Sequence, residues 1–130
     1  MTLAARPWAA FAAFCGGLGL MLCAFASHGA ETPEYALWLR LGGFGLVLHT
    51  LAALLALGLS PDRWGRISAA LFLFGGLVFA LSLAAMTFGA PRWMGIVTPG
   101  GGLAMIFGWL ALAWAFMRPI NTDAAEKQGG

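Results

Sequence analysis

Four long apolar runs occupy most of this chain and limit what it can fold into. They cover approximately residues 8–27, 35–59, 67–88 and 99–117. Each run approaches the ~20 residues that an α-helix needs to cross a membrane. Of the 130 residues, 61% are hydrophobic and 9% are charged, and so few polar side chains cannot cover a soluble domain of this size. The sequence therefore predicts an all-α integral membrane domain over residues 1–120 and a flexible polar tail over 121–130.

Short polar segments separate the runs and set the expected topology. Connections this short join antiparallel neighbours, so we expect a four-helix, up-and-down bundle with both termini on one side of the membrane. Five of the seven basic residues fall on the side of the termini, and two, Arg40 and Arg92, fall on the other side. Because Lys and Arg are enriched in cytoplasmic segments, we expect both termini in the cytoplasm.

Small residues that recur every four positions predict how the helices contact one another, because close backbone approach binds helices together in lipid. The ladders are Ala9, Ala13 and Gly17; Gly76, Ala80 and Ala84; and Gly100, Ala104 and Gly108. In the second run a histidine interrupts the corresponding ladder, which reads Gly45, His49 and Ala53. Residues four apart share a helix face, so we expect His49 to point into the bundle.

The dipeptide Thr98-Pro99 predicts the start of the fourth helix. Threonine is a suitable N-cap, and proline is tolerated at the first helical position, where its missing N–H costs nothing. Gly100, Gly101 and Gly102 would then form the first turn, whose amides have no partner within the helix. By similar reasoning, Ser68 or Ser60-Pro61 is expected to open the third helix.

His49 is expected about 18 Å below the outer end of its helix at ~1.5 Å per residue, near the middle of the bilayer. Titratable groups at this depth are functional candidates. One interpretation is a proton relay, a ligand contact or a metal ligand. The other is a neutral imidazole that hydrogen-bonds across a helix interface. The second histidine, His28, is expected at the outer boundary, too far away to complete a metal or haem site, so we predict no metal and no cofactor.

Polar residues are expected to collect at the outer ends of the helices. They are His28, Glu31, Glu34, Arg40, Arg92 and Thr98. One interpretation is an interfacial ion pair in which Arg40 meets Glu31 or Glu34; otherwise Arg40 extends outward past the apolar surface. The other interpretation is a shallow pocket for an anionic group, in which arginine charge adds to the open amides at Gly100, Gly101 and Gly102.

The sequence favours a binding protein over an enzyme. It contains no nucleophile beside a base, no carboxylate pair within a run and no phosphate loop with its lysine, so we predict no catalytic residues. The scattered arginines do not form a nucleic-acid footprint. The leading hypothesis is a non-enzymatic membrane protein whose outer pocket binds a lipid headgroup, a small ligand or a partner. The alternative is a small oligomeric transporter or channel that uses His49, and a third is a membrane enzyme or redox subunit. Expected partners are membrane lipids, and a second copy or another membrane protein.

Several short motifs resemble those of one protein family. They are Ala26-Ser27-His28-Gly29, the segment His49 to Leu55, the turn Thr98-Pro99-Gly100-Gly101-Gly102, and Phe107-Gly108-Trp109. In this order they are similar to the YgdD-like family, also called domain of unknown function 423, over about residues 9–115. The resemblance implies a small four-span protein of the bacterial inner membrane whose biochemical function is not established. It also implies that His28, His49, Thr98 and Gly101 occupy motif positions of that family.

Overall fold

The computed structural model describes residues 3–119. All regular secondary structure in this range is helical. The long helices are α1 (Arg6–His28), α2 (Pro33–Leu59), α3 (Arg63–Thr87) and α4 (Val97–Met117). Two short 3₁₀ helices, η1 (Leu3–Ala5) and η2 (Arg92–Ile96), precede α1 and α4. All four long helices are long and apolar enough to cross a membrane. The predicted all-α, four-span architecture is therefore confirmed, while the tail 121–130 lies outside the described residues.

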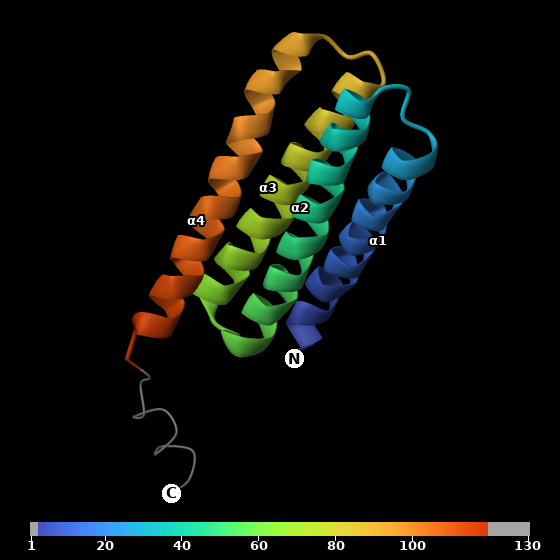
Figure 1. The fold of residues 1–130 in the computed structure, drawn as a ribbon. Coiled ribbons are helices and arrows are strands. Elements are labelled where there is room, and N and C mark those ends of the chain that lie inside the picture. Colours follow the sequence, from blue (N-terminus) through green and yellow to red (C-terminus); the bar gives the residue numbers. More distant parts are fainter. Residues whose placement is uncertain (1–2, 120–130) are drawn as a thin grey trace, which may run out of the picture.

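The four helices run up and down and lie side by side in chain order, so that they form an open row (Figure 1). α1 packs on α2, α2 on α3 and α3 on α4, and the two middle helices separate α1 from α4. We call the end with the α1–α2 and α3–α4 loops the distal end. The other end, where α1 begins and α4 finishes, is the terminal end.

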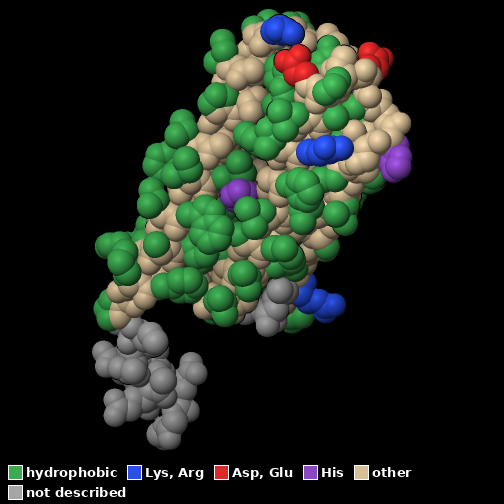
Figure 2. Space-filling view, in the orientation of Figure 1, with side chains coloured by type: hydrophobic (Ala, Val, Ile, Leu, Met, Phe, Trp, Pro, Cys, Tyr) green, Lys and Arg blue, Asp and Glu red, His purple; other side chains and the backbone are tan. Residues whose placement is uncertain are grey.

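Hydrophobic side chains cover most of the face seen in Figure 2, and the charged side chains lie mainly towards its two ends. Large apolar residues are also exposed along every helix; they include Phe14, Phe44, Phe74 and Phe107. In water such a surface would drive aggregation, whereas in a bilayer it faces lipid tails. The surface therefore agrees with the membrane assignment made from the lengths of the helices.

Adjacent glycines let each middle helix contact two neighbours. On α2, a Cβ added to Gly43 would lie 2.6 Å from the carbonyl oxygen of Gly19 in α1. A Cβ added to the preceding residue, Gly42, would lie 3.1 Å from the Cα of Ala80 in α3. Successive helix residues point about 100° apart at 3.6 residues per turn. One glycine pair therefore brings two different helices within backbone distance of α2.

The pair Gly75-Gly76 does the same on α3. A Cβ on Gly75 would lie 2.9 Å from the carbonyl oxygen of Gly101 in α4, and one on Gly76 would lie 3.2 Å from the Leu46 side chain in α2. Two side-chain hydrogen bonds join α3 to α4 on either side of this crossing. The Ser68 hydroxyl donates to the Gly108 carbonyl at 2.8 Å, and the hydroxyls of Ser82 and Thr98 are 2.7 Å apart.

These contacts correct two of the predicted ladders. The ladder on α3 is confirmed, since Gly76, Ala80 and Ala84 are all buried. On α1, however, Ala13 and Gly17 are exposed, and the packed face is Ala12, Cys15, Gly19 and Ala26. On α4, Gly100 is exposed and Gly101 is the buried glycine. The predicted register is therefore wrong on α1, whereas on α4 only Gly100 is misplaced, since Ala104 and Gly108 both pack on α3.

The start of α4 also differs from the prediction. The chain enters α4 directly from η2, with Ile96 already in a right-handed helical conformation and no side-chain cap. Thr98 is therefore the second residue of the helix and not its N-cap, and Pro99 is the third. Because only the N-cap and the first three helical positions lack intrahelical partners, the amides of Gly100, Gly101 and Gly102 are placed to hydrogen-bond within α4. The predicted open amides at these glycines are wrong.

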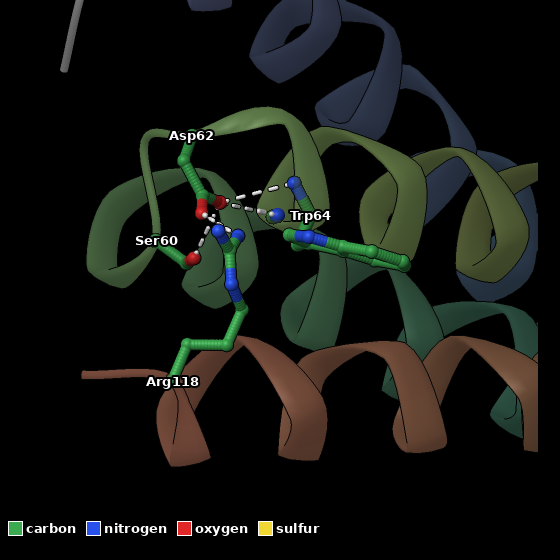
Figure 3. Close-up of polar contacts among 5 residues, drawn as sticks. Ser60, Asp62, Trp64 and Arg118 are labelled. Carbon is green, nitrogen blue, oxygen red and sulfur yellow. Dashed lines mark hydrogen bonds and ion pairs between the residues drawn. The ribbon is translucent and has the colours of Figure 1, made fainter. Parts of the chain in front are cut away.

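Asp62 fixes the turn between α2 and α3 at the terminal end (Figure 3). It is the N-cap of α3, and its Oδ1 accepts hydrogen bonds from the amides of Trp64 and Gly65 at 3.0 and 3.1 Å. The Ser60 hydroxyl donates to the same oxygen at 2.9 Å. The Arg118 guanidinium, beyond the end of α4, lies 3.5 Å from Oδ2. One carboxylate thus joins α2, α3 and α4, and α3 begins four residues before the predicted position 67.

We expect replacement of Asp62 to have a pH-dependent effect. The Gly65 amide, aided by the Ser60 hydroxyl, the Trp64 amide and Arg118, lowers the pKa of Asp62, although partial burial opposes this shift. A carboxyl with a lowered folded-state pKa stabilises the fold at neutral pH, and this contribution is lost as the pH falls below about 4. Asp62→Ala, which removes the cap, should cost about 1 kcal/mol at pH 7, measured by thermal unfolding in detergent.

Asp62→Asn is the matched variant because it keeps an acceptor for the amides and removes the charge. It should lose less stability than Asp62→Ala at pH 7. The difference between each variant and the wild type should shrink towards pH 3. An equal difference at both pH values would contradict the role of the charged carboxylate.

Gly101→Ala should destabilise the α3–α4 contact. Its Cβ would lie 2.6 Å from the Phe79 amide nitrogen and 2.7 Å from the Gly75 carbonyl oxygen, so the two backbones would have to separate, at a cost of about 1–3 kcal/mol. At the neighbouring Gly100 a Cβ meets nothing within 4 Å, and Gly100→Ala should stabilise the helix by about 0.5–1 kcal/mol. Thermal unfolding of both variants checks this contrast, and equal melting temperatures would refute the assigned register.

Candidate functional site

A shallow cavity of about 410 Å³ lies at the distal end, where α2, α3, η2 and α4 meet. Its lining residues are Trp38, Phe79, Leu83, Met86, Arg92, Gly95, Thr98 and Pro99. α3 forms the floor, since its three lining residues recur at spacings of three and four and so share one helix face. Trp38 of α2 forms one wall and the first turn of α4 forms the other. The cavity is therefore apolar on three sides.

Arg92 is the charged group of this cavity. It is exposed and is the first residue of η2. The preceding residue, Pro91, ends the loop that follows α3. Within residues 3–119 the structure forms one ion pair, between Asp62 and Arg118, and it lies at the opposite end of the molecule. Arg92 thus has no carboxylate partner in the described part of the chain. Its guanidinium is free to bind an anion with planar, paired hydrogen bonds.

Thr98 lines the cavity but uses its hydroxyl elsewhere. The Ser82 hydroxyl donates to the carbonyl oxygen of Phe79 at 3.0 Å. Because that donation uses the Ser82 proton, the Thr98 hydroxyl donates to Ser82 Oγ, 2.7 Å away. Thr98 therefore ties the start of α4 to α3 and places η2, with Arg92, above the cavity floor.

The structure brings only two of the predicted site residues together at this cavity, Arg92 and Thr98. His28 and Glu31 are exposed at and after the end of α1, and Arg40 is exposed on α2. The described residues form no ion pair between Arg40 and either Glu31 or Glu34, so the predicted interfacial pair is not formed. Gly100 faces outward and Gly101 packs on α3. These residues do not line the cavity.

His49 lies deeper, between α2 and α4 over the middle of α3. Its Nδ1 is 2.7 Å from the carbonyl oxygen of Gly45, one turn earlier on α2. The indole N–H of Trp109 on α4 donates to His49 Nε2 at 3.4 Å. Nε2 is thus the acceptor and Nδ1 carries the proton, so His49 is the neutral tautomer that is protonated on Nδ1. The imidazole also packs on Phe72, with ring centroids 5.5 Å apart.

This arrangement favours the structural interpretation of His49. Both ring nitrogens already have partners, and a second ring proton would face the Trp109 N–H, which is itself a donor. Within residues 3–119, no group of three His, Cys, Asp or Glu side chains is placed to hold a metal ion. His49 contacts α3 and α4 but is only half-buried, so the expected orientation into the bundle interior is met only in part.

Sequence reasoning missed most of the cavity lining. The lining residues it does not identify include Trp38, Phe79, Leu83 and Met86. The spacing of the last three shows that they share a face but does not show that this face remains uncovered.

A second cavity, of about 440 Å³, lies at the terminal end beside Ser60, Asp62 and Arg118. It is the less suitable binding site, because its two charged side chains lie 3.5 Å apart and compensate one another. The distal cavity instead combines an apolar lining with a cation that forms no ion pair within residues 3–119.

The bond between His49 and Trp109 is testable with a double-mutant cycle. His49→Leu and Trp109→Phe each remove one partner, and the double variant should lose less than the sum of the two. We expect a coupling energy of about 0.6 kcal/mol, which is typical of side-chain hydrogen bonds between membrane helices. The measurement is the free energy of unfolding in mixed micelles. Trp114→Phe on the same helix is the control, because Trp114 packs on Trp64; its effect should add to that of His49→Leu. An additive His49–Trp109 pair would argue against the bond.

Comparison with known proteins agrees with the fold. The family model described as "Protein of unknown function (DUF423)" matches residues 22–102, which include the loops, His49 and the start of α4. A UPF0382 membrane protein of Haemophilus influenzae is 35% identical over 107 residues, or 78% of this chain and 82% of that relative. No solved structure matches the chain. With its four apolar spans, this multi-pass membrane protein belongs to the DUF423 family, whose function is unknown.

Proposed function

We propose that this protein is a non-enzymatic membrane protein that holds the anionic headgroup of a membrane lipid in the distal cavity. The observation that carries the proposal is the position of Arg92, a cation without a carboxylate partner in the described chain, at a cavity whose other walls are apolar. A guanidinium binds phosphate with two parallel charge-assisted hydrogen bonds. The apolar lining favours a ligand with an apolar part over a small soluble acid.

The size and position of the cavity also support a lipid. Its volume of about 410 Å³ falls in the range of ~300–1,000 Å³ that is typical of small-molecule sites. Trp38 and Arg92 lie near the distal ends of their helices, at the level where a lipid headgroup meets the hydrocarbon core. Indole and guanidinium groups both favour this interface.

The proposal includes an orientation. Basic residues that flank the spans are more numerous at the terminal end, which supports a cytoplasmic location for that end. The cavity would then open at the outer leaflet of a bacterial inner membrane. The bacterial relative is named a membrane protein, which supports a membrane location. The alternative in which His49 serves as a transport gate has less support, because both ring nitrogens are already bonded.

Native mass spectrometry of the detergent-solubilised protein tests the proposal. We expect the wild type to retain phosphatidylglycerol, which is anionic, in preference to phosphatidylcholine. Arg92→Gln should reduce the affinity for phosphatidylglycerol about tenfold or more, because a hydrogen bond to a charged group contributes about 1.5–3 kcal/mol. Arg92→Lys should retain part of the affinity, since it keeps the charge and loses the paired geometry.

Arg66→Gln is the matched control. It removes the same charge from an exposed residue of α3 at the terminal end, and it should leave phosphatidylglycerol retention unchanged. If Arg66→Gln and Arg92→Gln reduce retention equally, the lipid responds to the overall charge and the proposed site is wrong.

A further inference from the structure

The cavity is the outer part of a longer helix face. We call the side on which α2 and α4 flank α3 the α2–α4 face. It carries Trp38, Gly45 and His49 of α2, Phe72, Phe79 and Leu83 of α3, and Thr98, Gly102 and Trp109 of α4. α2 and α4 both run from the distal to the terminal end (Figure 1). Their residues can therefore be compared level by level along the membrane normal.

Two levels on this face are fixed by contacts. Trp38 and Thr98 both line the distal cavity, and His49 and Trp109 hydrogen-bond to one another. His49 follows Trp38 by eleven residues, and Trp109 follows Thr98 by the same number. At ~1.5 Å per residue the two levels are about 16 Å apart. This is close to half of the ~30 Å hydrocarbon core, the depth of one leaflet.

Between these two levels, a glycine lies on each side of Phe79, Gly45 on α2 and Gly102 on α4. A Cβ on Gly45 would lie 3.5 Å from the Phe79 ring. Gly102 is one turn below Thr98 on the same side of α4, and a Cβ there would meet nothing within 4 Å. The half-buried Phe79 ring thus has no large side chain from Gly45 or Gly102 beside it. An alkyl chain that crossed the exposed part of this ring would meet no side chain from either glycine.

At the level of His49 and Trp109, aromatic side chains cover the α2–α4 face. The His49 and Trp109 rings lie over Phe72, with centroids 5.5 and 4.9 Å from its ring, and Phe72 is fully buried. The hydrogen bond between His49 and Trp109 spans from α2 to α4 above α3. This bridge ends the uncovered part of the face, about the depth of one leaflet from the cavity towards the terminal end.

We propose that one acyl chain of an anionic phospholipid lies along the α2–α4 face. Its headgroup phosphate binds Arg92, its chain crosses Phe79 between Gly45 and Gly102, and its end reaches the His49–Trp109 bridge. This inference rests on the proposed function, since it assigns the chain of the lipid whose headgroup that function places at Arg92. The glycines distinguish this lipid from others around the protein, because no side chain of Gly45 or Gly102 stands beside the Phe79 ring that the chain crosses.

Gly102→Leu and Gly100→Leu form the test pair. Both glycines lie in the first two turns of α4 with no atom near an added Cβ, but they point to opposite flanks of the helix, only one of which belongs to the α2–α4 face. We expect Gly102→Leu to lower the affinity for dipalmitoyl phosphatidylglycerol about tenfold by occupying the chain path. Gly100→Leu should leave it unchanged. Gly102→Ala, a smaller intrusion that is compatible with the fold, should have an intermediate effect.

Dihexanoyl phosphatidylglycerol separates the chain from the headgroup. Its chains are too short to continue past Gly102 to the His49–Trp109 bridge, so its binding should depend mainly on Arg92 and change much less in Gly102→Leu than the binding of dipalmitoyl phosphatidylglycerol. Retention of dipalmitoyl phosphatidylglycerol should depend on both residues. All lipid titrations are read by native mass spectrometry on the full chain.

The outcomes of the two proposals are distinct. If Gly102→Leu, Gly102→Ala and Gly100→Leu all retain dipalmitoyl phosphatidylglycerol like the wild type, while Arg92→Gln loses it, the chain path is wrong and the headgroup site stands. If Arg92→Gln also retains both lipids, the proposed function is wrong as well. A loss of both lipids in Gly102→Leu with an unchanged melting temperature would also overturn the chain path, since the leucine would then block the headgroup.

Discussion

Close backbone approach at glycine is the constraint on which the rest of this structure depends. Lipid tails are as apolar as leucine, so helices in a membrane gain little from burying apolar surface and associate through tight packing. In this chain the tight contacts are Gly19 with Gly43, Gly42 with Ala80, and Gly75 with Gly101. Only the middle helices carry a glycine pair whose two members contact different neighbours. The packing therefore produces a row, in which α1 and α4 each have one partner along most of their length.

The open row determines where a ligand site can form. In a closed bundle the face of α3 between α2 and α4 would be covered by a further helix. Here α1 packs on the other flank, where Trp8 and Phe11 contact Phe74, so the face with Phe79 stays uncovered. The Thr98–Ser82 hydrogen bond then fixes the start of α4 against α3 and sets Arg92 beside that face. The glycine contacts that hold the helices together thus also position the cavity.

The sequence predicted the helices well because length and hydrophobicity alone decide whether a segment can span a membrane. It predicted the contacts less well, because α1 offers two small-residue ladders and composition does not distinguish Ala9-Ala13-Gly17 from Ala12-Gly19-Ala26. Thr-Pro was ambiguous for a similar reason. Thr32 caps α2 by accepting from the Tyr35 amide, whereas Thr98 lies inside α4 because η2 continues directly into it. The preceding residues and the partner helix decide between these roles.

His49 shows how a titratable side chain can be accommodated on an apolar helix long enough to span a membrane, when both of its ring nitrogens have partners. A buried polar group is costly when unpaired, and here the Gly45 carbonyl and the Trp109 indole satisfy both ring nitrogens. α2 and α4 are not direct neighbours, so no backbone contact can join them, and a pair of long aromatic side chains has to cross above Phe72. The bridge therefore limits how far α2 and α4 can separate. A glycine-packed row needs such a restraint, since each crossing fixes only one pair of adjacent helices.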